Sequence, residues 1–141
     1  MPTVYERSHR MCLATLDSKE DTVKKYGKEG YGWKLFRKGI KGNIYGKVYH
    51  KIKDYAPYEI GKRYRADTMT IIMNKKQSYC SGFHLYATRR DARWDCWKGL
   101  QTVRKVKWSS PLASGTQRFP IGGKTIVAKY MTILPLKEKK K

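Results

Sequence analysis

A thiol and an imidazole stand close together in the middle of the sequence. Cys80 and His84 lie four positions apart, and such a pair can act as nucleophile and general base. The residues around them predict a strand, in which positions four apart are separated by about 13 Å along the backbone. We therefore expect Cys80 to be packed and His84 to serve structure or ligand binding, and we predict no catalytic residue.

Metal ligands and paired acids are also poorly placed. The three cysteines and three histidines show none of the short spacings of a zinc site. Asp91 and Asp95 lie one helical turn apart, where two carboxylates could share Mg²⁺. Asp91 is better explained as a first-turn acid facing the helix dipole, and Asp95 as a solvated residue between Arg93 and Lys98. No metal and no cofactor are predicted.

The segment Gly123-Lys124-Thr125 ends like a phosphate-binding P-loop. That motif also requires a glycine five positions before Gly123, because its backbone N–H groups must wrap around the phosphates. Arg118 occupies that position. The glycines are better explained as a hairpin turn before the last strand.

The net charge is the strongest signal in the sequence. There are 32 lysines and arginines against 11 acids, which gives a formal charge of +21. A solubilising surface usually mixes both signs and has a net charge of about 2–8, so an anionic partner is expected. No acid lies between Asp95 and Glu138, and a surface of one sign is therefore expected in the C-terminal half.

Tyrosine alternates with basic residues, which is typical of a solvent-exposed binding surface. Tyr45 and Tyr49 would share one strand face, and Trp94 would lie beside arginines on a helix, either stacking on a base or closing the edge of the core. We predict that stacking and neighbouring polar contacts come from Trp94, Tyr45, Lys47, Tyr49 and His84. The predicted phosphate contacts are Arg89, Arg90, Arg93, Lys98, Arg104, Lys105 and Lys107.

These residues need a scaffold of strands and two short helices. Asp17 and Ser18 predict a helix start and Gly27 its end, while Thr88 caps a second helix over 89–98. Turn glycines precede a strand over 33–38, and the run 68–73 predicts a buried strand. Further strands are expected over 44–50, 83–86, 102–108 and 125–134. This order predicts an α+β fold with a mainly antiparallel or mixed sheet.

The predicted domain spans 11–136, between a loose lead-in over 1–10 and a basic tail over 137–141. No apolar run reaches the ~20 residues that cross a bilayer. The start of the chain lacks the apolar region of a signal peptide, and the odd cysteine number argues against a disulfide framework. A cytoplasmic protein without membrane contact is expected.

Several short motifs resemble those of small proteins encoded by bacteriophages and prophages. They are Met11-Cys12-Leu13, Tyr58-Glu59-Ile60-Gly61, Cys80-Ser81-Gly82-Phe83-His84, Asp91-Ala92, the stretch 103–106 and Val127-Ala128-Lys129-Tyr130. The resemblance covers about two-thirds of the chain and brings no settled activity. It implies a phage context and, for the site, nothing catalytic.

Three functions follow from these observations. The first is a non-catalytic protein that binds DNA or RNA, or a nucleoprotein complex, as a phage accessory or host-takeover factor. The second is a phage inhibitor of host defence that docks on a nucleoprotein complex or an acidic host protein. The third is an enzyme that acts on a nucleotide, with His84 in the substrate pocket. The absence of glutamate from the C-terminal strands argues against it, because such an enzyme needs a catalytic carboxylate.

Overall fold

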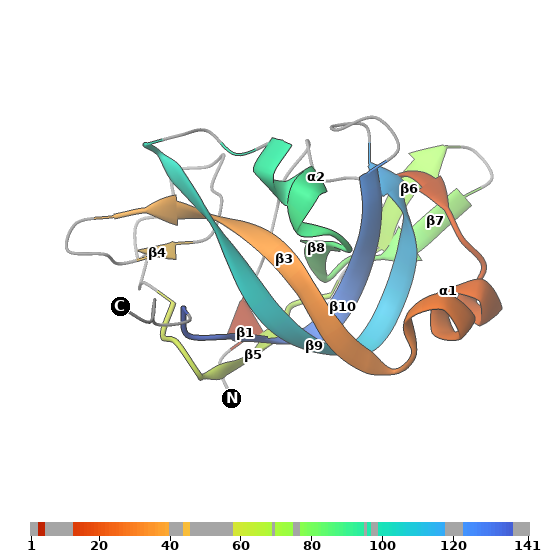
Figure 1. The fold of residues 1–141 in the computed structure, drawn as a ribbon. Coiled ribbons are helices and arrows are strands. Elements are labelled where there is room, and N and C mark those ends of the chain that lie inside the picture. The colour runs from red at the N-terminus through yellow and green to blue at the C-terminus, as the bar shows by residue number, and fades with distance from the viewer. Residues whose placement is uncertain are drawn as a thin grey trace.

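A computed structural model describes residues 3–4, 13–39, 44–45, 58–68, 70–74, 77–94, 96, 99–117 and 123–136. Antiparallel strands dominate it, and two helices accompany them (Figure 1), which confirms a mainly antiparallel sheet with two short helices. The helices are α1 (Lys19–Tyr26) and α2 (Arg89–Trp94). The strands are β1 (Thr3–Val4), β2 (Leu13–Leu16), β3 (Glu29–Lys38), β4 (Ile44–Tyr45), β5 (Arg63–Ala66), β6 (Thr70–Asn74), β7 (Gln77–Cys80), β8 (Phe83–Tyr86), β9 (Gln101–Gln117) and β10 (Gly123–Ile133).

Four strands pair in a closed cycle. β10 pairs with β8, β8 with β3, β3 with β9, and β9 returns to β10. β8 meets β3 through a single residue pair, Trp33 with Tyr86. β5 extends the sheet along the second half of β10, and β1 pairs with β5 in parallel. β2 pairs with the end of β9 and β4 with the end of β3.

The main core lies inside this cycle, and its largest side chain is the indole of Trp108 on β9. Gly30 and Gly32 make room for it. A Cβ at Gly30 would lie 3.1 Å from the Trp108 ring, and one at Gly32 would lie 3.6 Å from that ring and 3.3 Å from the Cβ of Leu85. Both glycines therefore belong to β3, where they allow close packing, and not to the turn expected before Trp33.

Two smaller clusters cover parts of the outer surface of the cycle. The β6–β7 hairpin packs over β9 and β10 through Tyr79, which clusters with Leu13, Ala113 and Val127. A strand, β6, is present where the run 68–73 predicts one, but the expected burial is wrong, because Ile72 is 77% exposed. In the described part of the chain, β6 pairs only with β7. Side chains alternate between the two faces of this hairpin, so only every second residue of β6 faces the cluster.

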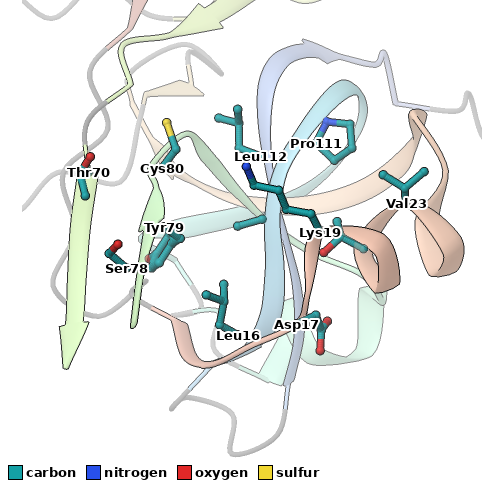
Figure 2. A pocket seen from close by; sticks show the side chains of 12 residues that line it. Leu16, Asp17, Lys19, Val23, Thr70, Ser78, Tyr79, Cys80, Pro111 and Leu112 are labelled. Carbon is teal, nitrogen blue, oxygen red and sulfur yellow. The ribbon is translucent and has the colours of Figure 1, made fainter. Parts of the chain in front are cut away.

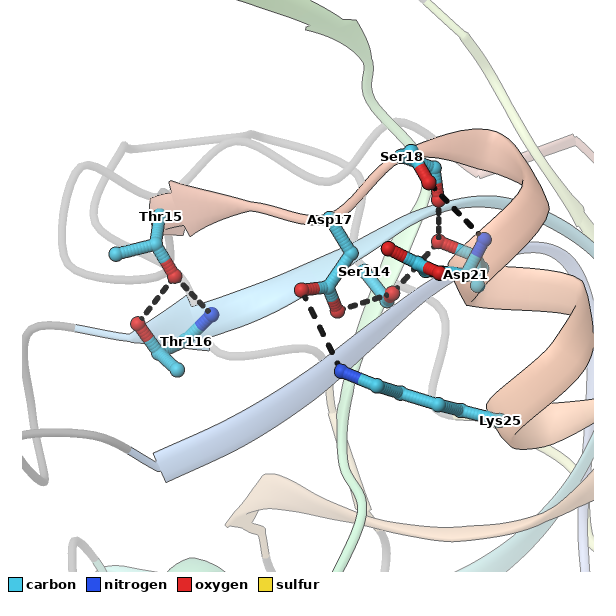
Figure 3. A network of polar contacts seen from close by, with 8 residues as sticks. Thr15, Asp17, Ser18, Asp21, Lys25, Ser114 and Thr116 are labelled. Carbon is cyan, nitrogen blue, oxygen red and sulfur yellow. Dashed lines mark hydrogen bonds and ion pairs between the residues drawn. The ribbon is translucent and has the colours of Figure 1, made fainter.

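Helix α1 closes one end of the cycle with the caps that the sequence predicts. Ser18 Oγ accepts a hydrogen bond from Asp21 N at 3.1 Å, and Gly27 ends the helix with φ of +78°. The Asp17 carboxylate accepts a 2.8 Å bond from Ser114 Oγ on β9 and lies 3.7 Å from Lys25 Nζ (Figure 3). These contacts fix the helix to the longest strand. Among the described helices, neither has the length and apolar character to cross a membrane.

Candidate nucleic-acid interface

Four neighbouring strands leave an outer surface on which aromatic and cationic side chains alternate. Across β5, β10, β9 and β3, one row of paired residues runs Arg63, Thr132, Lys107 and Tyr31, and the next runs Arg65, Tyr130, Ser109 and Glu29. Directly opposed residues of antiparallel strands point to the same side of a sheet. The aromatic–cation face, as this surface is called below, is made of Tyr31, Trp33, Arg63, Arg65, Lys105, Lys107, Lys129 and Tyr130.

Strand alternation places the cations of this face outside. On β5, Arg63 and Arg65 are exposed, whereas the alternate residues Tyr64 and Ala66 belong to the main core. On β9, Lys105 and Lys107 are exposed, and their neighbours on either side are buried. The two-residue period therefore presents two lysines and two arginines to solvent from strands that are distant in sequence.

The rings of the face already contact cations. Arg63 Cζ lies 4.2 Å from the centre of the Tyr130 ring, and Arg63 Nη2 donates to Ser109 Oγ at 3.3 Å. Lys105 Nζ lies 4.8 Å from the centre of the Tyr31 ring and 5.8 Å from that of Trp33. These cation–π distances hold charge and π-surface together, an arrangement suited to ligands with both phosphates and flat rings.

A break in the alternation of β10 adds Lys129 to the face. The core-facing residues of this strand are Ile126 and Ala128 before the break and Met131 and Ile133 after it. Lys129 and Tyr130 are consequently both outside, both half-buried, and Lys129 Nζ lies 5.7 Å from the centre of the Tyr130 ring. The face thus combines five cationic side chains with three rings, while Glu29 lies at its edge.

The structure distributes the predicted phosphate contacts over different environments. Lys105 and Lys107 lie on the aromatic–cation face. Arg104, between Val103 and Lys105, points inward and is 8% exposed, and its Nη2 donates to the Leu134 carbonyl at 2.9 Å. Burial lowers the pKa of its guanidinium, which nonetheless stays charged. Arg104 therefore stabilises the end of β10 and is not available to a phosphate at this surface.

His84 is also inside the molecule, with 4% of its surface exposed. Tyr79 Oη accepts from Leu13 N at 3.2 Å and lies 2.9 Å from His84 Nε2, while Nδ1 lies 3.1 Å from the Gly82 carbonyl. A carbonyl oxygen only accepts, so Nδ1 is the donor of that bond. His84 thus has a structural place, with both ring nitrogens bonded inside the molecule. Cys80 is half-buried, with Sγ 3.8 Å from the Ser81 carbonyl.

Helix α2 borders the face. Ala92 packs with Leu35 and Tyr86 in a cluster that Trp33 also contacts. Trp94 lies on the opposite side of the helix and is 66% exposed. The exposed arginines beside it are Arg89, Arg90 and Arg93.

The helix has six residues and ends at Trp94, earlier than the predicted Lys98. Thr88 Oγ1 accepts from Asp91 N at 3.3 Å, so one N–H group at its start is already bonded. Of the other predicted residues, Tyr45 lies in β4, where it pairs with Arg37. Lys47, Tyr49 and Lys98 lie outside the described residues.

Of the eight residues of the face, only Lys105 and Lys107 were among the predicted site residues. Lys129 and Tyr130 were not. The other four that were not predicted are Tyr31, Trp33, Arg63 and Arg65. Each belongs to an alternating segment, Tyr31-Gly32-Trp33 on β3 and Arg63-Tyr64-Arg65 on β5. A two-residue pattern of exposed rings or cations was therefore present in the sequence. Their juxtaposition with Lys105 and Lys107 depends on strand order, which the pattern alone does not give.

A second feature is a cavity of about 470 Å³ between α1, the β6–β7 hairpin and the bulged part of β9. Figure 2 shows Cys80 and Lys19 among its lining side chains, with Leu16 and Leu112 as apolar walls. Its one carboxylate, Asp17, is bonded to Ser114 and paired with Lys25. The cavity offers apolar surface and a thiol without an acid–base pair.

Within the described ranges, no group of three or more histidines, cysteines and acids is placed to hold a metal ion. Comparisons with protein-family models, with curated proteins and with solved structures gave no match.

Proposed function

We propose that this protein binds nucleic acid without catalysing its reaction, and that the aromatic–cation face is the binding surface. The observation that carries the proposal is the two neighbouring rows of paired residues across β5, β10, β9 and β3, where cations from distant segments surround Tyr31 and Tyr130. In a phage, the partner would be phage or host nucleic acid in the bacterial cytoplasm.

Phosphate and base contacts divide between the two kinds of side chain. Arg63, Arg65, Lys105 and Lys107 are exposed on one surface, where their field attracts a phosphate backbone. The neighbouring rings offer apolar surface to bases or sugars. Each neutralised phosphate would steepen the dependence of log affinity on log salt by about 0.9 for duplex and about 0.7 for single strands.

The test compares two double charge reversals with the same change in net charge. Lys105→Glu with Lys107→Glu alters the face, and Lys24→Glu with Lys124→Glu alters exposed lysines on α1 and at the start of β10. Fluorescence anisotropy with labelled oligonucleotides at about 150 mM salt gives the affinities. We expect a loss of more than tenfold for the first pair and of less than threefold for the second.

Equal losses for the two pairs would mean that net charge, and not this face, attracts the nucleic acid. If the unaltered protein binds no nucleic acid at that salt concentration, the proposal fails. The charge would then serve an acidic protein surface, which a pull-down from nuclease-treated bacterial lysate would capture.

A further inference from the structure

We infer that the aromatic–cation face selects single-stranded nucleic acid, with bases stacking on Tyr31, Trp33 and Tyr130. This inference rests on the proposed function and specifies its ligand. It requires that the rings be reachable, that their spacing suit separated bases, and that the surface be unsuited to a duplex.

All three rings are at least partly exposed on this face. Tyr31 is 54% exposed. Trp33 is half-buried against the α2 cluster, and Tyr130 is half-buried beside Arg63. A ring anchored on one side loses little further freedom when a base covers the other side. This is the state in which an aromatic side chain contributes stacking to binding.

Strand geometry fixes the spacing of the three rings. Tyr31 and Trp33 are two residues apart on β3, which separates them by about 7 Å. Tyr130 lies two strands away, with β9 between, at about 10 Å across the sheet. Neighbouring bases in one strand of a duplex are about 3.4 Å apart. Rings at twice that spacing or more fit bases that have come apart from one another.

The width of the face argues against duplex readout. Four strands span three intervals of about 4.8 Å, or about 14 Å before side chains are counted. The major groove of B-DNA is about 12 Å wide and admits a helix or a two-stranded ribbon. A four-stranded surface remains outside the groove, and paired bases hide the flat surfaces that the rings would contact.

The cations that now lie over the rings have a second use in the complex. Lys105 is shared by Tyr31 and Trp33, and Arg63 covers Tyr130 while reaching Ser109. A base arriving on a ring displaces the lysine or stacks on the guanidinium plane. The displaced charge then remains within reach of the adjoining phosphate.

The experiment measures affinity for three oligonucleotides with the same number of phosphates, in DNA and RNA forms, at about 150 mM salt. They are a single-stranded 12-mer, a 12-nucleotide hairpin duplex and an abasic 12-mer. We expect the single strand to bind at least tenfold more tightly than either of the others. Tyr31→Ala and Tyr130→Ala should each weaken single-strand binding about tenfold and leave abasic binding unchanged.

Control variants separate the rings from the fold. Tyr31→Phe and Tyr130→Phe keep the rings and should bind like the unaltered protein. Trp94→Ala removes an exposed ring from α2 and should also have no effect. Equal affinity for single strand and duplex, equal affinity for the abasic strand, or a loss confined to Trp94→Ala would overturn the inference and leave nucleic-acid binding standing. Failure to bind all three ligands would overturn the proposed function as well.

Discussion

Tyr79 connects three segments of the chain through one hydroxyl group. Its Oη accepts from Leu13 N on β2 and is hydrogen-bonded to His84 Nε2 on β8, while its ring packs among Leu13, Ala113 and Val127. The tyrosine is 5% exposed, so water cannot easily take the place of its hydroxyl in these hydrogen bonds. The hydroxyl therefore contributes to stability.

Tyr79→Phe should lower the free energy of unfolding by about 1–3 kcal/mol, because the buried Leu13 N–H loses its acceptor. Tyr64→Phe is the matched control. Tyr64 is equally buried, but its hydroxyl accepts from the N–H of exposed Glu59, which water can serve instead. Urea denaturation of the two variants measures the difference. Similar small losses for both would show that the Tyr79 hydroxyl is not a structural link.

Tyr26 should make the free energy of unfolding depend on pH in the alkaline range. Burial raises the pKa of its phenol, and the charge of Asp17 raises it further. The folded state therefore holds this proton more tightly than the unfolded state, whose tyrosines ionise near pH 10. The contribution is fully present below about pH 10 and is lost as the pH rises through the higher value of the folded state.

We expect the unaltered protein to lose more stability than Tyr26→Phe between about pH 9 and pH 11.5. Urea denaturation of both proteins across this range isolates Tyr26 from the other ten tyrosines and the lysines, because those groups are common to both. Parallel stability curves would contradict the assignment.

At the scale of elements, β2 and β9 approach each other at Gly115. A Cβ at this position would collide with the Thr15 carbonyl. Beside it, Thr15 Oγ1 lies 2.6 Å from Thr116 Oγ1 and accepts from Thr116 N at 3.1 Å (Figure 3). The glycine thus allows the strand that leads into α1 to lie directly on the longest strand of the sheet.

Gly115→Ala should cost at least about 3 kcal/mol, because backbone and not a flexible side chain must move. Gly61→Ala is the comparison, since Gly61 has φ of +82° and a Cβ there would meet nothing within 4 Å. That change should cost only about 1 kcal/mol from its left-handed backbone. Thermal and urea denaturation give both values. A smaller cost at Gly115 than at Gly61 would show that β2 moves away easily.

Elements with local signals were predictable from sequence. The Ser18 cap and Gly27 define α1, and the residues of β8 and most of β10 read as strands. The prediction for β9 stopped at Trp108, whereas the strand continues through Pro111 to Gln117. Ser110, with φ of +55°, and a shift in register carry the strand past the proline. No local pattern predicts such a bulge, because pairing with β10 stabilises it.

The candidate site was predictable in part for the same reason. Lys105 and Lys107 were found from charge alone. Their relation to Tyr31 and Arg63 arises from strand pairing between distant segments, which a single sequence does not encode in any short window. Arg104 was predicted from charge in the same way but is buried. It lies one residue before Lys105 on β9, and consecutive residues of a strand point to opposite faces.

At the scale of the whole molecule, a net charge of +21 opposes the compact state. Salt screens this repulsion, with a Debye length of about 10 Å at 0.1 M. We therefore expect the melting temperature to rise between about 20 and 200 mM NaCl, as differential scanning fluorimetry would measure. Sodium chloride and sodium sulfate at equal ionic strength separate screening from anion-specific effects. A falling melting temperature would show that attractive ion pairs outweigh repulsion.

The position of β10 has a consequence for how the protein is made. This strand pairs with β5, β8 and β9, yet it follows all of them in the chain. During synthesis the earlier strands must wait for residues 123–133 before the cycle can close. The growing chain is meanwhile cationic and carries unpaired strand edges, the condition in which partly folded proteins aggregate. Folding of the nascent chain should therefore be cooperative and should begin only after β10 has been synthesised. Until then, the first polyanion that the cationic chain meets is the RNA of the ribosome.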